Sequence, residues 1–417
     1  MRPTALLEAD LSLSDVEVVG AVADVLAVPR RADSDSFVLH APLELLARTA
    51  LLHFVSVDQR PRARGRIMEI ADSFESFGDG VAPPAAVAPG SLKDAAAALG
   101  RAIDAGDLDD VDSYAAWLGA HARPLDLPPL LADMVVPRLA AAGHAPILLW
   151  LLPRVAPRGE VTGGLLRPLC RELAGAPSWR IGWIDDASAD ARAGMFTDPD
   201  DLFGALADAP RLGRPASTFI FPLMSRVDTP ELAGRLLAPI LDVAVADVDA
   251  YGAALARVAA WSMLAEPGDE APYGWSHCLT MPQAVIGVAH HCASPARALA
   301  VAATHVLGFR ASLAHDEIDT SVSSTWLPHG LTLTQAIALG PDAARAAMWH
   351  LPVDHRREAV AALATFAATH ADAHLAKFTL ACFDAASLDP AASRLYLTAA
   401  ATLAGWWSAH PDGVEIA

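Results

Sequence analysis

Cysteine is scarce in this chain, and no two cysteines lie close together in the sequence. The four are Cys170, Cys278, Cys292 and Cys382, and no C-x-x-C motif is present. A disulfide framework or a zinc ribbon needs cysteines at short, regular spacings. Both classes are therefore excluded, and the cysteine pattern favours a reducing compartment, the cytoplasm.

Clusters of basic residues are also missing. Acidic residues outnumber lysine and arginine by 49 to 30, which gives a formal net charge of −19. The one gathering of arginines, at residues 60–66, is interrupted by proline, alanine and glycine. Because nucleic-acid binding depends on basic side chains that neutralise phosphates, no nucleic-acid partner is expected.

The chain has no long hydrophobic run. The longest, PILLWLLP at residues 146–153, is far shorter than the roughly 20 residues that a membrane-spanning helix needs. The first fifteen residues, MRPTALLEADLSLSD, hold acids and lack the apolar stretch of a signal peptide. Neither a membrane partner nor a signal peptide is expected.

Glycine-rich nucleotide motifs are absent as well. Neither G-x-G-x-x-G nor G-x-x-x-x-G-K-[ST] occurs, and G-x-S-x-G is not found. These motifs mark dinucleotide sites, P-loops and the nucleophile of α/β-hydrolases. The sequence thus carries no flavin or nicotinamide signature.

What the chain has instead is helical composition. Alanine and leucine are abundant, β-branched runs are rare, and apolar residues recur at three- and four-residue steps in residues 43–55, 92–103, 232–264 and 359–383. This pattern predicts an all-α, multi-helix, single-domain, bundle-like fold with few or no strands. Within it we expect an N-terminal helical subregion (1–77), a Pro/Gly/Ala-rich connector (78–91) and a main helical domain (92–417).

Three histidines stand at comparable places in the chain. His40, His144 and His277 each precede, by two to five residues, a proline that opens an apolar helical stretch. A capping or corner role explains any one of them. Since imidazole is the commonest protein metal ligand, the recurrence also makes the three candidate ligands.

A fourth histidine is paired with a lysine. In DAHLAKFTLACFDAA, residues 372–386, His374 and Lys377 lie three residues apart and so project from one side of a helix. The lysine either extends its amine to water or is buried. Burial disfavours the charged amine, and a neutral amine can add carbon dioxide to become an anionic carbamate. Beside an imidazole, such a group is a reasonable ligand for iron or another first-row metal.

A second constellation competes with this one. His291 follows another histidine, and His315 is adjacent to Asp316 in SLAHDEID. Metal-dependent phosphohydrolases of the HD type bind metals through such His and His-Asp pairs. A solvated helix end is the ordinary alternative for these residues.

Four segments resemble the questin oxidase-like family, in that family's order along the chain. DAHLAKFTLACFDAASLDP (372–390) resembles its D-x-H-x-x-K-[LF]-T-x-A-C signature, and the others are LHAPLELLARTALL (39–52), GHAPILLWLLPRV (143–155) and SHCLTMPQAVIGVA (276–289). The segment around His144 departs most, because apolar residues replace the family's second histidine and its arginine. That departure leaves open a non-catalytic helical small-molecule binding protein with a decayed site.

The resemblance implies a helical oxygenase of secondary metabolism that uses dioxygen on an aromatic or quinone, polyketide-like molecule. Family members act by Baeyer–Villiger-type oxidation or ring cleavage, with a mononuclear non-haem iron, Fe(II), and a carboxylated lysine. Carried over to this chain, the ligands are His40, His144, His277, His374 and Lys377.

Further residues are candidates around such a metal. Glu44 and Asp372 could orient ligand imidazoles through their second nitrogen. Aromatic side chains could line an apolar substrate cavity, namely Trp150, Trp275, Phe309, Trp406 and Trp407. Ordinary core packing is the alternative for each aromatic residue.

Overall fold

The computed structural model describes residues 13–31, 36–155, 163–187, 196–266, 268–328 and 330–411. Most of the segment considered for a signal peptide, residues 1–12, lies outside them. Throughout the described ranges the regular structure is helical, apart from two isolated bridges, Arg30 with Gly80 and Arg138 with Arg180. The predicted all-α class is confirmed.

The chain divides into two compact units. Unit 1 comprises Met1–Arg180 with His291–Ala293, and unit 2 comprises Ile181–His290 with Ser294–Ala417. The predicted connector at residues 78–91 lies inside unit 1, so the units divide the chain elsewhere than the predicted subregions do.

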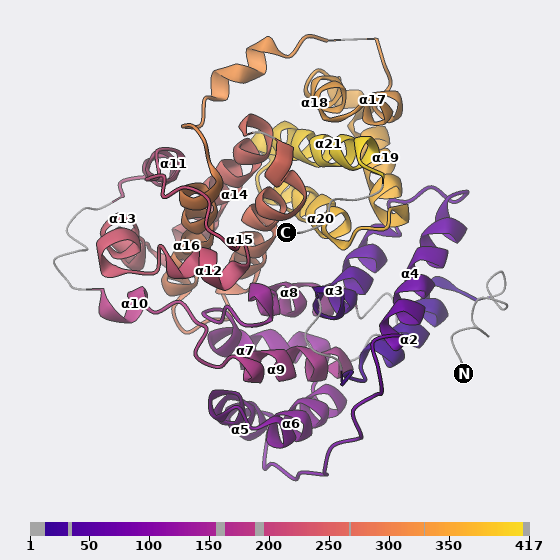
Figure 1. Cartoon of the computed structure of the whole chain (residues 1–417), viewed down its shortest axis with the longest axis vertical. Helices are drawn as coiled ribbons and strands as arrows, with labels where there is room; N and C mark the ends of the chain where they lie inside the picture. Colours follow the sequence, from indigo (N-terminus) through magenta and orange to yellow (C-terminus); the bar gives the residue numbers. More distant parts are fainter. Residues whose placement is uncertain are drawn as a thin grey trace. The chain divides into compact units, whose positions relative to one another are not determined.

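Unit 1 is built from helices of 9 to 16 residues. They are α2 (Asp15–Leu26), α3 (Ser36–Leu51), α4 (Arg60–Glu75), α5 (Leu92–Ala105), α6 (Leu108–His121), α7 (Leu127–Val135), α8 (Ala145–Val155) and α9 (Leu166–Gly175). α5 and α6 lie side by side (Figure 1). The turn between them is short because Gly106, at φ 68°, ends α5 and Asp107 caps α6.

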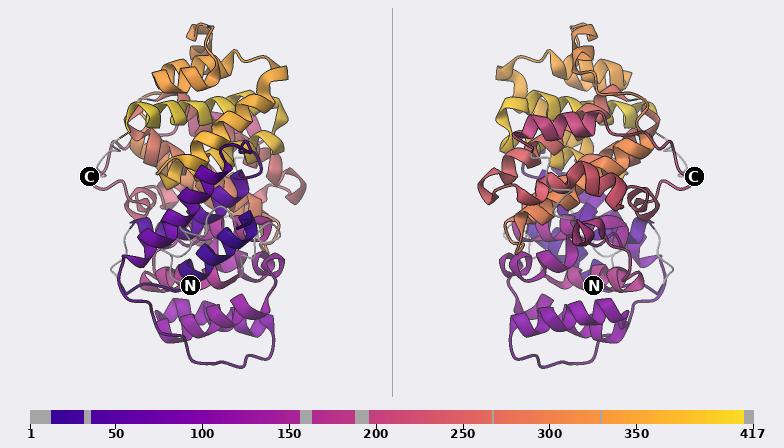
Figure 2. Two further views of the ribbon diagram at one scale, coloured as in Figure 1. Left: turned by 90° about the vertical axis from the view of Figure 1, so that its right-hand side faces the viewer. Right: turned by 90° about the vertical axis from the view of Figure 1, so that its left-hand side faces the viewer.

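Unit 2 contains the longest helices and several single turns. Its α-helices are α10 (Trp183–Asp186), α11 (Pro199–Ala207), α12 (Ile220–Ser225), α13 (Arg235–Leu237), α14 (Val248–Ala265), α15 (Ser276–Ala289), α16 (Pro295–Leu313), α17 (Leu333–Leu339), α18 (Pro341–Trp349), α19 (Arg356–Thr369), α20 (Ala373–Leu388) and α21 (Ser393–Ala409). α20 and α21, drawn in yellow, lie side by side in both views of Figure 2. A π-helical turn, η10 (Ala271–Trp275), leads directly into α15.

Two of the stretches with helical apolar spacing contain breaks. Residues 232–264 contain short turns before α14 begins at Val248. Residues 359–383 break between α19 and α20, where the Asp372 side chain accepts a hydrogen bond from the Leu375 amide at 3.0 Å. Aspartate is a strong helix N-cap, and this preference is what starts a new helix at Ala373.

The described residues also bear on membrane crossing. Not one of their helices combines the length and the apolar character that a bilayer span requires. This agrees with the absence of a long hydrophobic run in the sequence.

Candidate metal centre

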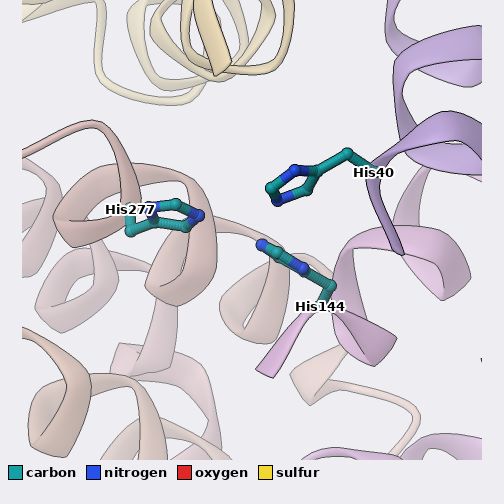
Figure 3. Close-up of side chains that lie close together, drawn as sticks. All are labelled: His40, His144 and His277. Carbon is teal, nitrogen blue, oxygen red and sulfur yellow. The ribbon is translucent and has the colours of Figure 1, made fainter. Parts of the chain in front are cut away.

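Unit 1 buries two of the candidate imidazoles against each other. His40 on α3 is 7% exposed and His144, directly before α8, is 1% exposed. Their ring centroids are 4.7 Å apart and their planes are inclined by 61°, as the edge-on arrangement in Figure 3 shows. α3 and α8 pack together, so the pair is fixed by the core of unit 1.

His40 was expected at the start of its helix, and this expectation is wrong. α3 begins at Ser36, and Pro42 lies inside it. His40 therefore stands more than one turn into α3, where the backbone on both sides of the residue is helical.

His144 is held by an unusual turn. The two alanines before Gly143 adopt left-handed backbone angles, Ala141 at φ 54° and Ala142 at φ 50°, and Gly143 follows at φ 67°. L-residues with a Cβ atom rarely occupy this region, which costs roughly 1–2 kcal/mol per residue. The turn places His144 directly before α8. This position agrees with the corner role that the sequence offered for it.

Glu44, one turn after His40, has guanidinium groups as its described partners. Its Oε1 accepts from Arg48 at 2.6 Å and from Arg66 at 3.2 Å. The Glu44 and Arg48 side chains are 1% and 0% exposed. The carboxylate that the sequence offered as an orienting group for an imidazole is thus part of a buried ion-pair network.

Unit 2 buries a second pair of imidazoles. His277 on α15 and His374 on α20 are 8% and 5% exposed, with ring centroids 4.9 Å apart and planes inclined by 70°. The Tyr273 ring meets His374 edge-on at 4.8 Å, and the Phe309 ring lies parallel to that of His277 at 6.5 Å. The packing of α15 against α20 brings the two histidines together.

The hydrogen bonds of this pair assign its tautomers. The Nδ1 atom of His277 bonds to the Tyr273 carbonyl oxygen, and that of His374 bonds to Asp372 Oδ2 at 3.2 Å. Both oxygens can only accept, so Nδ1 carries the proton in each ring. In the neutral imidazole the lone pair is then on Nε2, which is the usual arrangement of a metal-binding histidine.

The ionisation of the surrounding groups suits the same role. Burial, helped by the nearby charges of His374 and Lys377, lowers the pKa of His277 well below its ordinary value. His277 is therefore neutral at physiological pH, as a ligand must be. Burial raises the pKa of Asp372, but His374, the hydrogen bond from the Leu375 amide and the nearby Lys377 together outweigh burial and leave the pKa below the ordinary value. Asp372 accordingly remains a carboxylate.

Lys377 is buried. Its exposed fraction is 4%, and it lies one turn after His374 on α20. An amine extended into bulk solvent is inconsistent with this burial, so of the two readings of Lys377 the buried one is confirmed. Its carboxylation stays a prediction.

The aromatic candidates have different surroundings. Trp275, 1% exposed, lines a cavity of about 270 Å³ in unit 2 together with Leu313 and Glu270. Trp150 in unit 1 is half-buried beneath the Arg154 guanidinium group, 4.6 Å from the ring centroid. Trp406 and Trp407 on α21, and Phe309 on α16, are buried.

The residues of the HD-type alternative lie at the surface. His291 is exposed, and His315 and Asp316 are exposed in the loop after α16. The His315 amide donates to Glu266 Oε2 at 2.9 Å, and the Asp316 carbonyl accepts from Arg310 at 2.8 Å. These bonds describe a loop held by its backbone, and they do not favour a metal site.

Tyr273 was not among the predicted site residues. It precedes His277 by four residues, so within helical backbone its carbonyl faces the His277 side chain. The π-helical turn that carries it is of a kind often found at functional sites. The signal in the sequence was an aromatic residue one turn before a candidate ligand.

Comparisons of the chain with models of protein families, with characterised proteins and with solved structures gave no match.

Proposed function

We propose that the protein is a non-haem, metal-dependent oxygenase, with iron as its metal, that uses dioxygen to oxidise an aromatic or quinone-type small molecule. The observation that carries the proposal is the burial of an imidazole pair in each unit. In support, the ring centroids of His40 and His144 lie 4.7 Å apart in unit 1, and those of His277 and His374 lie 4.9 Å apart in unit 2. The proposal requires the two pairs to share one ion.

The donor set fits a first-row metal. Four imidazoles, from His40, His144, His277 and His374, suit iron, copper, zinc or nickel equally in donor type. Lys377 would add an anionic oxygen if its amine nitrogen bonded to carbon dioxide and released a proton. A bound iron would supply dioxygen binding and activation. Its choice over the other metals follows the family resemblance.

The protein's own residues would prepare the ligands. The Tyr273 carbonyl and the Asp372 carboxylate hold the Nδ1 protons of His277 and His374 and so aim Nε2 of each ring. Burial and the Asp372 charge raise the pKa of the Tyr273 phenol to about 12, which keeps it protonated. The substrate would lie against aromatic walls such as Trp275, and Baeyer–Villiger insertion or ring cleavage would follow.

Residence in the cytoplasm is part of the proposal. Three of the four cysteines, Cys170, Cys278 and Cys382, are buried free thiols. A reducing compartment would keep them so.

Elemental analysis of the purified full chain tests the proposal. We expect one iron per chain, lost in His277→Ala and in His40→Ala and retained in His305→Ala. His305 is the matched control because it is a buried histidine of unit 2, 1% exposed, outside the ligand set. Metal that stays in His277→Ala but is lost in His315→Ala would favour the phosphohydrolase. A metal-free wild type would favour a non-catalytic binding protein.

Carboxylation of Lys377 has a separate test. Lys377→Ala should lose iron, and added acetate should restore it because a free carboxylate can replace the carbamate oxygens. Retention of iron in Lys377→Ala without acetate would remove the lysine from the ligand set.

A further inference from the structure

Three oxidisable side chains form a continuous series in unit 2. The series begins at Tyr273, whose ring is 4.8 Å from that of His374. Trp407 follows at 6.4 Å from Tyr273, and Trp406 lies 5.0 Å from Trp407, each contact edge-on. Neighbouring rings thus stand close enough for direct contact along the whole series.

The far end of the series reaches solvent. The ring of His410, which is exposed, stacks on Trp406 at 4.1 Å with an interplanar angle of 16°. The backbone of exposed Gly268 also covers the Trp406 indole, since a Cβ atom at Gly268 would lie 3.3 Å from Trp406 Cδ1. Trp406 itself is 5% exposed, so a small part of its surface is in contact with water.

Helix geometry explains how two consecutive residues, Trp406 and Trp407, contact different neighbouring rings. Successive side chains on an α-helix are rotated by about 100°. On α21, this rotation turns Trp407 toward Tyr273 and Trp406 toward His410. The packing of α21 against η10 and α20 holds the series in place.

One feature of Trp407 exceeds what core packing needs. Its indole Nε1 is buried and has no hydrogen-bond partner among the described residues. Buried indole N–H groups are normally paired. An oxidised indole without a proton acceptor keeps its proton and stays strongly oxidising, so it passes the charge to a neighbouring ring.

We propose that Tyr273, Trp407 and Trp406 form a path for single-electron transfer between the candidate metal centre and the protein surface. This inference rests on the proposed function, because an oxidising centre is what the path would serve. The path protects the ligand histidines when the metal has been oxidised with dioxygen and no substrate is present to react.

Electrons move along the series one at a time. Tyr273 gives one electron to the oxidised metal centre and its phenolic proton to water, which its partly exposed side chain can reach. Trp407 then returns an electron to the tyrosyl radical, which takes up a proton from water. Trp406 reduces the Trp407 radical cation, and an external one-electron reductant, a thiolate or ascorbate, reduces Trp406. The net change is one electron from the reductant to the metal.

Photochemical oxidation of the metal-free full chain tests the path. A soluble ruthenium polypyridyl sensitiser with a sacrificial electron acceptor oxidises indoles at the surface, and electron paramagnetic resonance identifies the radicals that form. We expect a tyrosyl radical that is lost in Tyr273→Phe and in Trp407→Phe. Trp117→Phe is the matched control, because Trp117 stacks on a histidine in the same way, on His121 at 4.2 Å, and lies in unit 1.

Two results would overturn the path. One is a tyrosyl signal of wild-type size in Trp407→Phe, and the other is an unchanged signal in Tyr273→Phe. Thermal unfolding of each variant shows whether it is folded. If Trp407→Phe does not fold, Trp406→Phe interrupts the path in its place and should also lose the tyrosyl signal. Because the protein in this experiment holds no metal, a failure to bind iron would overturn the proposed function and leave this result standing.

Discussion

Each unit places a carboxylate near its candidate imidazoles, and the two carboxylates have different partners. Glu44 of unit 1 binds the guanidinium groups of Arg48 and Arg66, whereas Asp372 of unit 2 binds His374. The sequence offered both acids for one role. The difference shows that proximity to a histidine along the chain does not decide what an acid contacts.

Position within the helix explains the difference. Glu44 lies in the middle of α3, where Arg48 follows it by one turn and forms an i, i+4 pair. Asp372 lies before the first turn of α20, where one oxygen accepts from the Leu375 amide and the other remains for the His374 ring. The Asp372 carboxylate is thus fixed by a backbone amide through one oxygen and can orient the His374 side chain through the other.

The largest expected effect comes from breaking the unit 1 network. Glu44→Ala leaves Arg48 buried without a counter-charge and should lower the free energy of unfolding by about 3–5 kcal/mol. Urea denaturation of the full chain measures this. Glu69→Ala is the control, since Glu69 pairs with the same Arg66 at 2.9 Å but is 59% exposed, and it should cost at most about 1 kcal/mol. Equal effects of the two substitutions would contradict a structural role for Glu44.

His305 is a buried imidazole without a carboxylate partner among the described residues, and it should make the free energy of unfolding depend on pH. Burial lowers the pKa of His305 from 6.5 to about 4. Below pH 6.5 the unfolded chain binds a proton that the folded chain does not, so stability falls with decreasing pH until about pH 4 and is unaffected above pH 6.5.

The expected loss from His305 is about 3 kcal/mol, because each pKa unit corresponds to roughly 1.4 kcal/mol. Denaturation curves at a series of pH values, compared between wild type and His305→Leu, isolate it. An identical slope in the two proteins between pH 4 and 6.5 would show that His305 does not titrate in this way.

Asp372→Asn tests whether the charge of the unit 2 carboxylate supports metal binding through His374. Asparagine caps a helix as well as aspartate does, so stability should change little. The charge that holds the His374 ring is lost, and metal affinity should fall about 10–100-fold. Competition with a chelator measures the affinity. Glu44→Gln should leave it unchanged, and an equal fall in both variants would erase the distinction between the two acids.

The smallest effect concerns the turn that carries His144. Ala142→Gly removes the Cβ atom from a left-handed residue and should raise the free energy of unfolding by about 1 kcal/mol. Ala140→Gly, at an ordinary φ of −58°, should lower it by about 0.4–1 kcal/mol. Both are measured by urea denaturation, and a destabilised Ala142→Gly protein would show that the turn carries no strain.

These elements show how much the sequence could predict. Helical spacing was sufficient for the all-α fold and for the shared side of His374 and Lys377, because the period of 3.6 residues depends on local backbone alone. The break before Ala373 was missed because the apolar pattern runs through it, although Asp372 is a good cap. The left-handed turn at Ala141 and Ala142 had no signal at all, since alanine is typical of helices.

We propose that imidazoles from both units, together with Lys377, bind one metal ion. Anomalous X-ray scattering on either side of the iron absorption edge, from crystals of the full chain, tests it most directly. We expect a single iron peak within bonding distance of His40, His144, His277, His374 and a carboxylated Lys377. A crystal of iron-supplemented protein with no peak there, or with the Lys377 amine remote from the ion, would contradict it.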